Sequence, residues 1–314
     1  MNLLALNIGY ILLGFLLLFK GGDYLVDGAV AIARRAKLSS MVIGLTIVGF
    51  GTSSPELLVS IQAALAGSPG ISIGNVVGSN IADIALILGA TAILAVCPAT
   101  KKTLRIDMPF MIVASVVFII VAMTGTISRV AGLIGFASLV AFVVWQVINS
   151  RKNAVADDNQ STQPLMPLWK AIIMVVCSFV ALVFGADLLV QGARSIASTM
   201  GVSERVIGLT IVAVGTSLPE LFASIMAARK GETDMAIGNV IGSVTFNILC
   251  VIGLSASVCT IEKSDEGFLF DYLLMTFLGL LLWLFLRTKH RLERWEGVVL
   301  FSIYILYIVK LIIF

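Results

Sequence analysis

Apolar residues occur along this chain in long runs, which are interrupted by short charged or glycine- and proline-rich segments. A run of about 18 or more apolar residues can cross a bilayer as a helix. Because so many runs reach this length, the pattern predicts an all-α polytopic membrane protein with ten transmembrane helices. The ten predicted spans lie near residues 3–33, 41–65, 70–96, 108–124, 130–149, 168–199, 204–228, 235–259, 268–286 and 295–313.

The composition agrees with this class. Of the 314 residues, 59% are hydrophobic and only 12% are charged, and the mean hydropathy is +1.06. A soluble domain of this size could not bury so much apolar surface, so soluble classes are excluded. The four cysteines show no CxxC spacing and only one histidine is present. Neither a disulfide nor a zinc or copper site is therefore expected.

One stretch of the chain occurs twice. Residues 44–89 and 208–253 align at a constant offset of 164 without a gap, with 24 identities in 46 positions. A fixed repeat of this kind indicates an internal duplication. We therefore expect a first five-span repeat over residues 1–150, a cytoplasmic linker over 151–167 and a second five-span repeat over 168–314.

The basic residues predict the orientation in the membrane. With the N-terminus outside, the inward loops hold 14 of the 21 Lys and Arg residues. The positive-inside rule therefore places both termini on the extracellular side of the cell membrane. Because five crossings are an odd number, the second repeat enters the bilayer from the opposite side, and the repeats are expected to be inverted. Asp23 and Asp187, which recur at the same offset, are interpreted as helix-end or gating acids.

Each repeat carries a proline inside an apolar span, in the motifs GTSSPE and GTSLPE. Proline lacks an N–H group and clashes with the carbonyl four residues earlier, so Pro55 is expected to break its helix and to free the Gly51 carbonyl. Pro219 is expected to act in the same way on Gly215. Free carbonyls at membrane depth are tolerated only where they line a cavity or hold an ion.

A glutamate follows each proline, Glu56 in the first repeat and Glu220 in the second. An ionisable side chain inside a bilayer costs at least about 2.5 to 3.5 kcal/mol on insertion scales. Since neither motif offers a nearby basic residue within the span, we expect a bound cation to compensate for the two charges.

The following helix of each repeat begins GNVVGSNIAD or GNVIGSVTFN. Ser79 and Asp83 are four residues apart, as are Ser243 and Asn247, so each pair shares a helix face. In each repeat, the serine hydroxyl therefore lies on the same helix face as the carboxylate or amide that follows it. Further candidates for the polar lining are Asn75 and Asn239.

Together these elements supply a set of oxygen ligands. Hard cations such as Ca²⁺ and Na⁺ prefer such ligands, whereas Mg²⁺ gives up its water reluctantly. Three carboxylates in one cavity repel each other unless cations or protons neutralise them. Three Na⁺ would balance the charge, whereas one Ca²⁺ would balance two carboxylates and leave Asp83 to take up a proton. The candidate metal ligands are Glu56, Glu220, Asp83, Asn247, Thr52, Thr216, Ser53, Ser217, Ser79 and Ser243.

Competition of two ions for the same acids would couple their movements without ATP. The chain contains no GxxxxGKS or GxxxxGKT phosphate loop, which favours secondary transport. We expect Ca²⁺, Na⁺, a proton and the lipid bilayer as partners, and no nucleotide, nucleic acid or resident cofactor. An enzyme is not expected either, because no span contains a histidine or a nucleophile paired with a base.

The paired motifs resemble the two alpha repeats of the cation/calcium antiporter superfamily, specifically its sodium/calcium exchanger branch of prokaryotic type. The resemblance covers both halves and all ten predicted spans. It implies a secondary active antiporter that exchanges Na⁺ for Ca²⁺ by alternating access. In this family spans 1 and 6 would slide against a bundle that contains the ion sites.

The resemblance also implies roles for single residues. Glu56 and Glu220 would be ligands shared by Ca²⁺ and Na⁺. Asp83 and Asn247 would form the central pair, in an order reversed relative to several relatives, including the potassium-dependent branch. Because the two positions face each other across the pseudo-two-fold axis, we expect the central site to be retained. The implied hydroxyl contacts are Thr52, Ser53, Thr216, Ser217, Ser79 and Ser243, and the implied backbone carbonyl contacts are Gly49 and Ala213.

Three alternatives to Na⁺/Ca²⁺ exchange are left open. H⁺/Ca²⁺ exchange also uses paired glutamates, but the proton-coupled branch resembles a GNxxE arrangement that does not follow GNVV or GNVI here. K⁺-dependent Na⁺/Ca²⁺ exchange is the second. A passive cation channel is the third, and inverted repeats with broken helices favour alternating access over an open pore.

Overall fold

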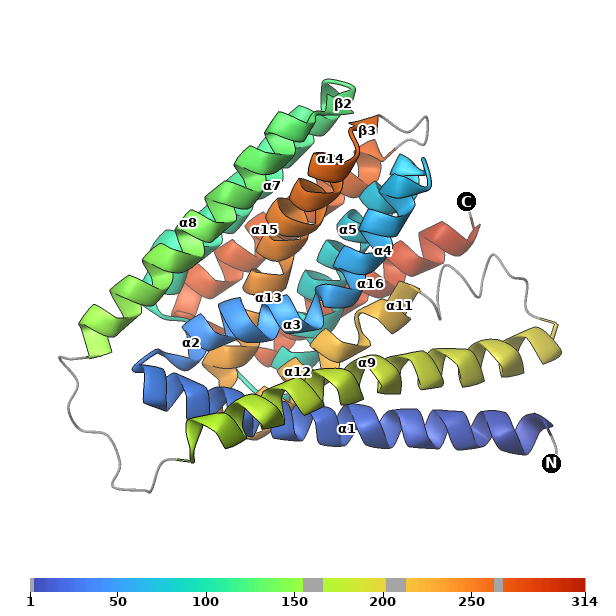
Figure 1. Cartoon of the computed structure of the whole chain (residues 1–314), viewed down its shortest axis with the longest axis horizontal. Coiled ribbons are helices and arrows are strands. Elements are labelled where there is room, and N and C mark those ends of the chain that lie inside the picture. Colours follow the sequence, from blue (N-terminus) through green and yellow to red (C-terminus); the bar gives the residue numbers. More distant parts are fainter. Residues whose placement is uncertain (1–2, 155–165, 202–212, 263–267, 314) are drawn as a thin grey trace.

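Long apolar helices make up most of the protein in the computed structural model, which describes residues 3–154, 166–201, 213–262 and 268–313 (Figure 1). In these residues eight helices are long and apolar enough to cross a membrane, and one bent helix pair raises the number to nine. The predicted all-α membrane architecture is thereby confirmed. The remaining predicted span, 204–228, begins outside the described residues, as does most of the predicted linker.

The helical segments are broken in several places by short π-helical turns, which are labelled η. Up to residue 154 the elements are α1 (Leu3–Ala36), α2 (Ser40–Ile43), η1 (Gly44–Val48), α3 (Gly49–Thr52), α4 (Ser54–Leu65), α5 (Pro69–Ile81), η2 (Ala82–Leu88), α6 (Gly89–Leu94), β1 (Cys97–Pro98), η3 (Thr103–Asp107), α7 (Met108–Met123), β2 (Thr126–Ile127) and α8 (Arg129–Ala154). From residue 166 they are α9 (Leu168–Thr199), α11 (Ala213–Thr216), α12 (Leu218–Arg229), α13 (Thr233–Phe246), η5 (Asn247–Ile252), α14 (Gly253–Val258), β3 (Ile261–Glu262), α15 (Leu269–Lys289), β4 (Arg291–Leu292) and α16 (Arg294–Ile313).

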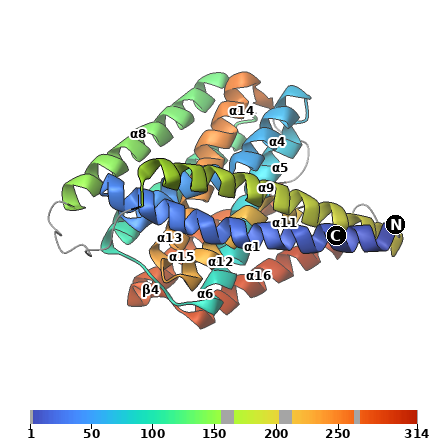
Figure 2. The ribbon, with the colours of Figure 1, turned by 60° about the horizontal axis from the view of Figure 1, so that its bottom comes forward.

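The two longest helices, α1 and α9, lie side by side and antiparallel along one edge of the molecule (Figure 1), as the turned view also shows (Figure 2). The side-chain amide of Asn7 on α1 donates to the Ser195 hydroxyl on α9 at 2.7 Å. Both helices expose many large apolar side chains, as expected for surfaces that face lipid. The pair is therefore a peripheral layer against the remaining bundle.

Helices of the two halves cross each other at close range. α13 packs on α2, η1 and α3. A Cβ atom at Gly238 would lie 2.4 Å from the Met41 carbonyl oxygen, and one at Gly44 would lie 2.4 Å from the Met235 carbonyl oxygen. Only glycine allows backbones to approach so closely. One hydrophobic cluster accordingly contains residues from both halves.

Two short strand pairs also connect loops of the two halves. β1 pairs antiparallel with β4, which places Cys97 opposite Leu292. β2 pairs antiparallel with β3, which places Thr126 opposite Glu262. Each pair therefore fastens a loop of the first half to a loop of the second half.

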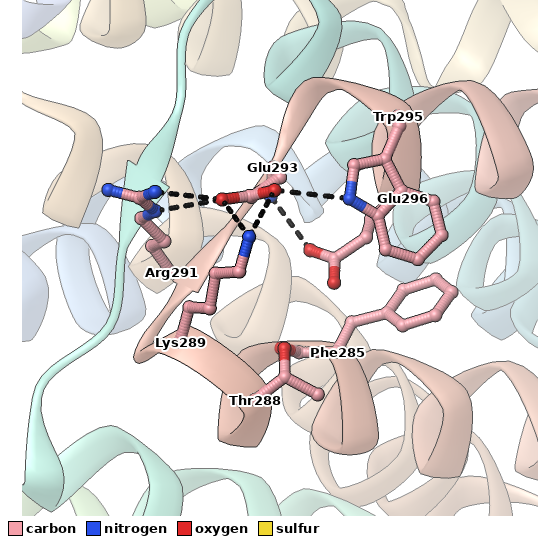
Figure 3. A network of polar contacts seen from close by, with 7 residues as sticks. All are labelled: Phe285, Thr288, Lys289, Arg291, Glu293, Trp295 and Glu296. Carbon is pink, nitrogen blue, oxygen red and sulfur yellow. Dashed lines mark hydrogen bonds and ion pairs between the residues drawn. The ribbon is translucent and has the colours of Figure 1, made fainter.

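Glu293 lies next to β4, in the turn between α15 and α16, and is surrounded by donors (Figure 3). Lys289 Nζ and Arg291 Nη2 lie 3.0 and 2.8 Å from Glu293 Oε1, and Trp295 Nε1 donates to Oε2 at 3.1 Å. Hydrogen bonds from Arg291 and then Lys289 lower the pKa of Glu293 to about 2. The carboxylate therefore stays ionised at physiological pH.

We expect Glu293→Gln to cause a small decrease in the melting temperature of the detergent-solubilised protein at neutral pH. The effect is small because exposed ion pairs contribute little. Since the folded-state pKa lies below the ordinary value of 4.5, the contribution is complete above that value and is lost as pH falls towards about 2. Melting curves of both proteins should therefore converge in acid and also in high salt, and a difference that grows in acid would contradict this account.

Candidate functional site

The first motif breaks its helix where the proline predicts. α3 ends at Thr52, α4 begins at Ser54, and the two helical segments meet at an angle of 46°. This confirms the predicted break. However, the Gly51 carbonyl is not free, because the Ser54 hydroxyl donates to it at 2.7 Å. The prediction of a free carbonyl at Gly51 was therefore wrong: a serine beside the proline replaces the lost N–H donor.

Glu56 and Glu220 occupy equivalent places in the two halves. Glu56 lies in the first turn of α4 and Glu220 in the first turn of α12, with a proline at the start of each helix. The exposed fractions of the two residues are 1% and 2%. The N-terminal end of a helix carries a partial positive charge, which favours a carboxylate there. The broken helices thus direct both acids into the protein interior.

Contacts across the two halves bring the glutamates together. The Ser53 hydroxyl, at the start of α4, donates to Glu220 Oε1 at 3.2 Å. No hydrogen bond of normal geometry reaches either carboxylate oxygen of Glu56, although the Thr216 hydroxyl lies close enough to interact with it. Each broken helix therefore presents a hydroxyl to the glutamate of the other half.

The amide side chains of Asn75 and Asn239 hold the two glutamate helices in place. Asn239 Nδ2 donates to the Glu220 carbonyl at 3.3 Å and to the Ser224 hydroxyl at 2.9 Å. Asn75 makes the same two contacts in the first half, with Glu56 and its neighbour one turn on, at 3.2 and 2.9 Å. These asparagines therefore act mainly as positioning residues for the glutamates. The serines Ser60 and Ser224, which complete the contacts, were not among the predicted lining residues.

Asp83 and Asn247 lie in π-helical turns, Asp83 in η2 and Asn247 at the start of η5. Such turns often mark functional sites. Asn247 Nδ2 donates to Asn80 Oδ1 at 3.1 Å, so its amide oxygen points elsewhere. Asn80 is fully buried and was missed in the sequence, because Val244 occupies the equivalent position of the second repeat.

Six of the twelve predicted ligands carry buried oxygen atoms without a protein partner. An unsatisfied buried acceptor costs about 1 to 3 kcal/mol, and more when it is charged. The three carboxylates of Glu56, Asp83 and Glu220 also act on one another electrostatically. The unpartnered atoms are Glu56 Oε1 and Oε2, Asp83 Oδ2, Ser217 Oγ, Glu220 Oε2, Ser243 Oγ and Asn247 Oδ1. This acceptor set suits hard cations, which would supply the missing partners.

The remaining predicted ligands lie around this group. The Thr52 hydroxyl donates to the Val48 carbonyl at 3.0 Å, and the Gly49 carbonyl accepts the Ser53 N–H at 3.1 Å. Ser79 is buried on α5, and Ala213 is the first residue of α11. Among the described residues, no three acidic, histidine or cysteine side chains lie close enough to form a metal cluster alone. Hydroxyl and carbonyl oxygens would therefore be needed as well.

A cavity of about 240 Å³ reaches this region from α9. Its lining includes Pro55, Thr216 and Pro219 of the two motifs, together with Asp187. Residues of both motifs are therefore accessible from one side.

The interior of α1 is tied to the C-terminal end of α12 by charges. Lys230 Nζ lies 2.9 Å from Asp23 Oδ1 and 2.6 Å from Asp27 Oδ1. Burial lowers the pKa of Lys230, but its hydrogen bonds with Asp27 and Asp23 outweigh burial and raise the pKa above the ordinary value. The ammonium therefore stays charged, and Asp23 is an ion-pair partner.

The family model that is described as sodium/calcium exchanger protein matches residues 6–148 and 170–313 of this chain. The chain is 38% identical to CaxA of Alkalimonas amylolytica, which is described as a candidate antiporter, over 95% of this chain and 96% of CaxA. It is 33% identical to the sodium/calcium exchanger MaX1 of Methanosarcina acetivorans, over 98% and 99% of the two chains.

A solved structure shares the fold. The sodium-calcium exchanger NCX_Mj, soaked with 10 mM Na⁺ and 10 mM Sr²⁺, superposes with a TM-score of 0.82 and 32% sequence identity, over 98% of both chains. The family model and the relatives cover both motifs and nearly the whole length of the chain. They confirm the resemblance that the motifs indicated: this protein belongs to the sodium/calcium exchanger family, a family of multi-pass membrane transporters.

Proposed function

We propose that this protein is a secondary active antiporter that exchanges Na⁺ for Ca²⁺ across the cell membrane by alternating access. Glu56 and Glu220 are the ligands that both ions share. Hydroxyl, amide and carbonyl oxygens complete the coordination of the ions. The other proposed ligands are Asp83, Asn247, Thr52, Thr216, Ser53, Ser217, Ser79, Ser243, Gly49 and Ala213.

One observation carries this proposal: buried, unpartnered oxygen atoms of both halves gather around two carboxylates. Within the described residues, no salt bridge reaches Glu56, Glu220 or Asp83. Buried charges without a partner are strongly unfavourable. A hard cation satisfies the charge and the unpartnered acceptors at once, and sodium and calcium are the substrates of the family.

Competition for the same carboxylates couples the two ions. Ca²⁺ neutralises Glu56 and Glu220, and a proton on Asp83 removes the third charge. Na⁺ ions, which each carry one charge, replace Ca²⁺ only as a group, so the site is neutral with either cargo. A site that is neutral with either ion can be exposed to each side in turn, while a site without an ion retains unpaired charges inside the membrane.

Alternating access is supported by a difference between the two sides of the motifs, since one side is open to a cavity and the other is closed by ion pairs. The cavity beside Thr216 and Pro219 reaches them from one side. On the other side Lys230 holds α1 against α12 through Asp23 and Asp27. Breaking these ion pairs would allow α1 to move along the bundle, as sliding of the peripheral helices requires.

Several features support an arrangement of two inverted five-helix repeats, 1–150 and 168–314, joined by a cytoplasmic linker at 151–167. β1 and β3 lie at equivalent positions, offset by 164 residues, and so do the contacts of Asn75 and Asn239. The two ends of the described chain lie at the same side of the molecule (Figure 1). This agrees with ten spans and with both termini outside.

A gradient-swap flux assay tests the function. Purified protein in proteoliposomes loaded with Na⁺ should take up Ca²⁺, and uptake should stop when the outward Na⁺ gradient is removed at constant pH. Uptake that follows an imposed pH gradient would show proton coupling and overturn the proposal. Ca²⁺ flux without any counter-ion gradient would show a channel.

Asn239→Ala tests the positioning of Glu220. We expect the apparent affinity for Ca²⁺ to fall about tenfold, because loss of a residue that orients a ligand typically costs 10- to 100-fold. The variant removes the contacts with both the Glu220 carbonyl and the Ser224 hydroxyl. Ser224→Ala keeps the first contact and should have a smaller effect. Equal Ca²⁺ affinities of Asn239→Ala and the wild type would refute this role.

A further inference from the structure

A second buried acid lies outside the proposed ion site. Asp107 ends η3, and Gln146 lies on α8 near the end that leads to the linker. Both residues are buried, with exposed fractions of 1% and 0%. Gln146 Nε2 donates to Asp107 Oδ1. Asp107 Oδ2 and Gln146 Oε1, by contrast, have no partner in the protein.

The groups around this pair do not supply the missing donor. Lys102 acts on the Asp107 carboxylate electrostatically, yet no hydrogen bond reaches Oδ2. On α15, Trp283 Nε1 donates to the Leu104 carbonyl at 2.9 Å, and Arg287 stacks over the Trp283 ring at 4.7 Å.

We propose that Asp107 and Gln146 form a proton-binding site. A protonated carboxyl group has one O–H donor and one carbonyl acceptor, and a primary amide has an N–H donor and a carbonyl acceptor. With a proton on Oδ2, the O–H donates to Gln146 Oε1 while Gln146 Nε2 donates to Oδ1. One bound proton therefore closes a cyclic pair and satisfies both unpartnered oxygens.

The second repeat differs from the first at this pair. At the offset of 164, Asp271 corresponds to Asp107. α16 follows α8 at an offset of 165, since Arg294 and Gly297 correspond to Arg129 and Gly132, so Leu311 corresponds to Gln146 and Tyr307 to Phe142. Tyr307 lies close to Asp271, and Asp271 Oδ1 also has no partner in the protein. In the first half the aspartate faces the Gln146 amide, which donates to one carboxyl oxygen and can accept an O–H group from the other.

The pair joins two helices that make few other polar contacts with each other. One turn further along, Phe110 of α7 stacks on Phe142 of α8 with ring centroids 3.7 Å apart. One turn in the other direction, the Ser150 hydroxyl accepts the Ser39 N–H at the start of α2. As pH rises the proton is lost, and Asp107 Oδ2 and Gln146 Oε1 are then both acceptors without a donor. The contact between η3 and α8 therefore weakens. Protonation thus stabilises the packing of α8 at this end of the molecule.

Infrared spectroscopy of the full-length protein in detergent tests the site. At neutral pH in Na⁺ without Ca²⁺, where the proposed ion site carries no proton, we expect a carbonyl band of a protonated carboxylic acid, which disappears in Asp107→Asn and persists in Asp83→Asn. In Asp107→Asn the two side-chain amides can form the same cyclic pair, so this variant should have the wild-type melting temperature. In the wild type the melting temperature should fall as pH is raised through the titration of the band. In Asp107→Asn it should not. Asp107→Ala should melt lower than both proteins.

A second pair of variants keeps the test decisive if Asp107→Asn does not fold. Gln146→Leu removes the acceptor of the O–H group, so the acid band should shift to the higher frequency of an unbonded acid. Lys102→Met should leave the band unchanged. Absence of a band that depends on Asp107, or a pair that requires Lys102 or added Na⁺ in place of a proton, overturns the proposal.

Discussion

Glu56→Gln is expected to reduce Na⁺-driven Ca²⁺ uptake into proteoliposomes by at least about 30-fold, and Glu220→Gln should do the same. Glutamine keeps the shape of the side chain but removes the charge, so Ca²⁺ faces one carboxylate in place of two. Loss of one partner of a buried charge pair costs about 2 to 5 kcal/mol, and about 1.4 kcal/mol corresponds to a factor of ten.

The matched control is Glu262→Gln, which makes the same chemical change at an exposed position on β3. It should transport at the wild-type rate. Both glutamine variants at the motifs should remain folded, because removal of a buried charge relieves repulsion among three carboxylates. Their melting temperature without Na⁺ and Ca²⁺ is therefore expected to be at least that of the wild type. Normal transport by either variant would exclude the proposed ion site.

The glutamates also show what could be predicted from the sequence. Their apolar surroundings and their recurrence at a fixed offset are visible in the linear chain. The break at Pro55 follows from the chemistry of proline alone. These features depend on residue type and local spacing, so no knowledge of tertiary contacts was needed to predict two acids at broken helices.

Other contacts could not be predicted because they depend on three-dimensional packing. The repeat alignment identified positions that both halves share, and it therefore hid Asn80, which is replaced by valine in the second half. The ion pair between Lys230 and Asp23 joins residues 207 positions apart in the sequence. The partner of the Gly51 carbonyl depends on the rotamer of Ser54, which sequence patterns do not determine.

Asn75 and Asn239 illustrate a limit of polarity as a signal. Both were predicted to be part of the polar lining of the site; Asn239 is buried and Asn75 is partly buried. Sequence spacing indicates which face of a helix carries an amide, but not whether the amide reaches a cavity or a neighbouring backbone. In the structure their amide groups contact the carbonyls of the glutamates. A polar residue near an ion site can thus act by orienting a ligand.

Gly238→Ala is expected to have the largest effect on stability, with a loss of about 3 kcal/mol, at the upper end of typical costs of overpacking. The new Cβ atom would lie 2.4 Å from the Met41 carbonyl oxygen and 3.1 Å from the Leu45 amide nitrogen. Both are backbone atoms, so no side chain can rotate away and α13 must shift. Because α13 also carries Asn239 and Ser243, transport should fall together with the melting temperature.

Gly135→Ala in α8 separates this steric effect from the general effect of alanine in a helix. Its Cβ atom would meet the Leu249 carbonyl oxygen at 3.7 Å, which is an ordinary contact. Alanine is more favourable than glycine in a helix by about 1 kcal/mol, so this variant should melt at or above the wild-type temperature. The two variants differ only in what the added methyl group touches. Equal melting temperatures of Gly238→Ala and Gly135→Ala would contradict this account. The close crossing of α13 with the first half would then not limit stability, because the packing near Met41 could accommodate the added methyl group.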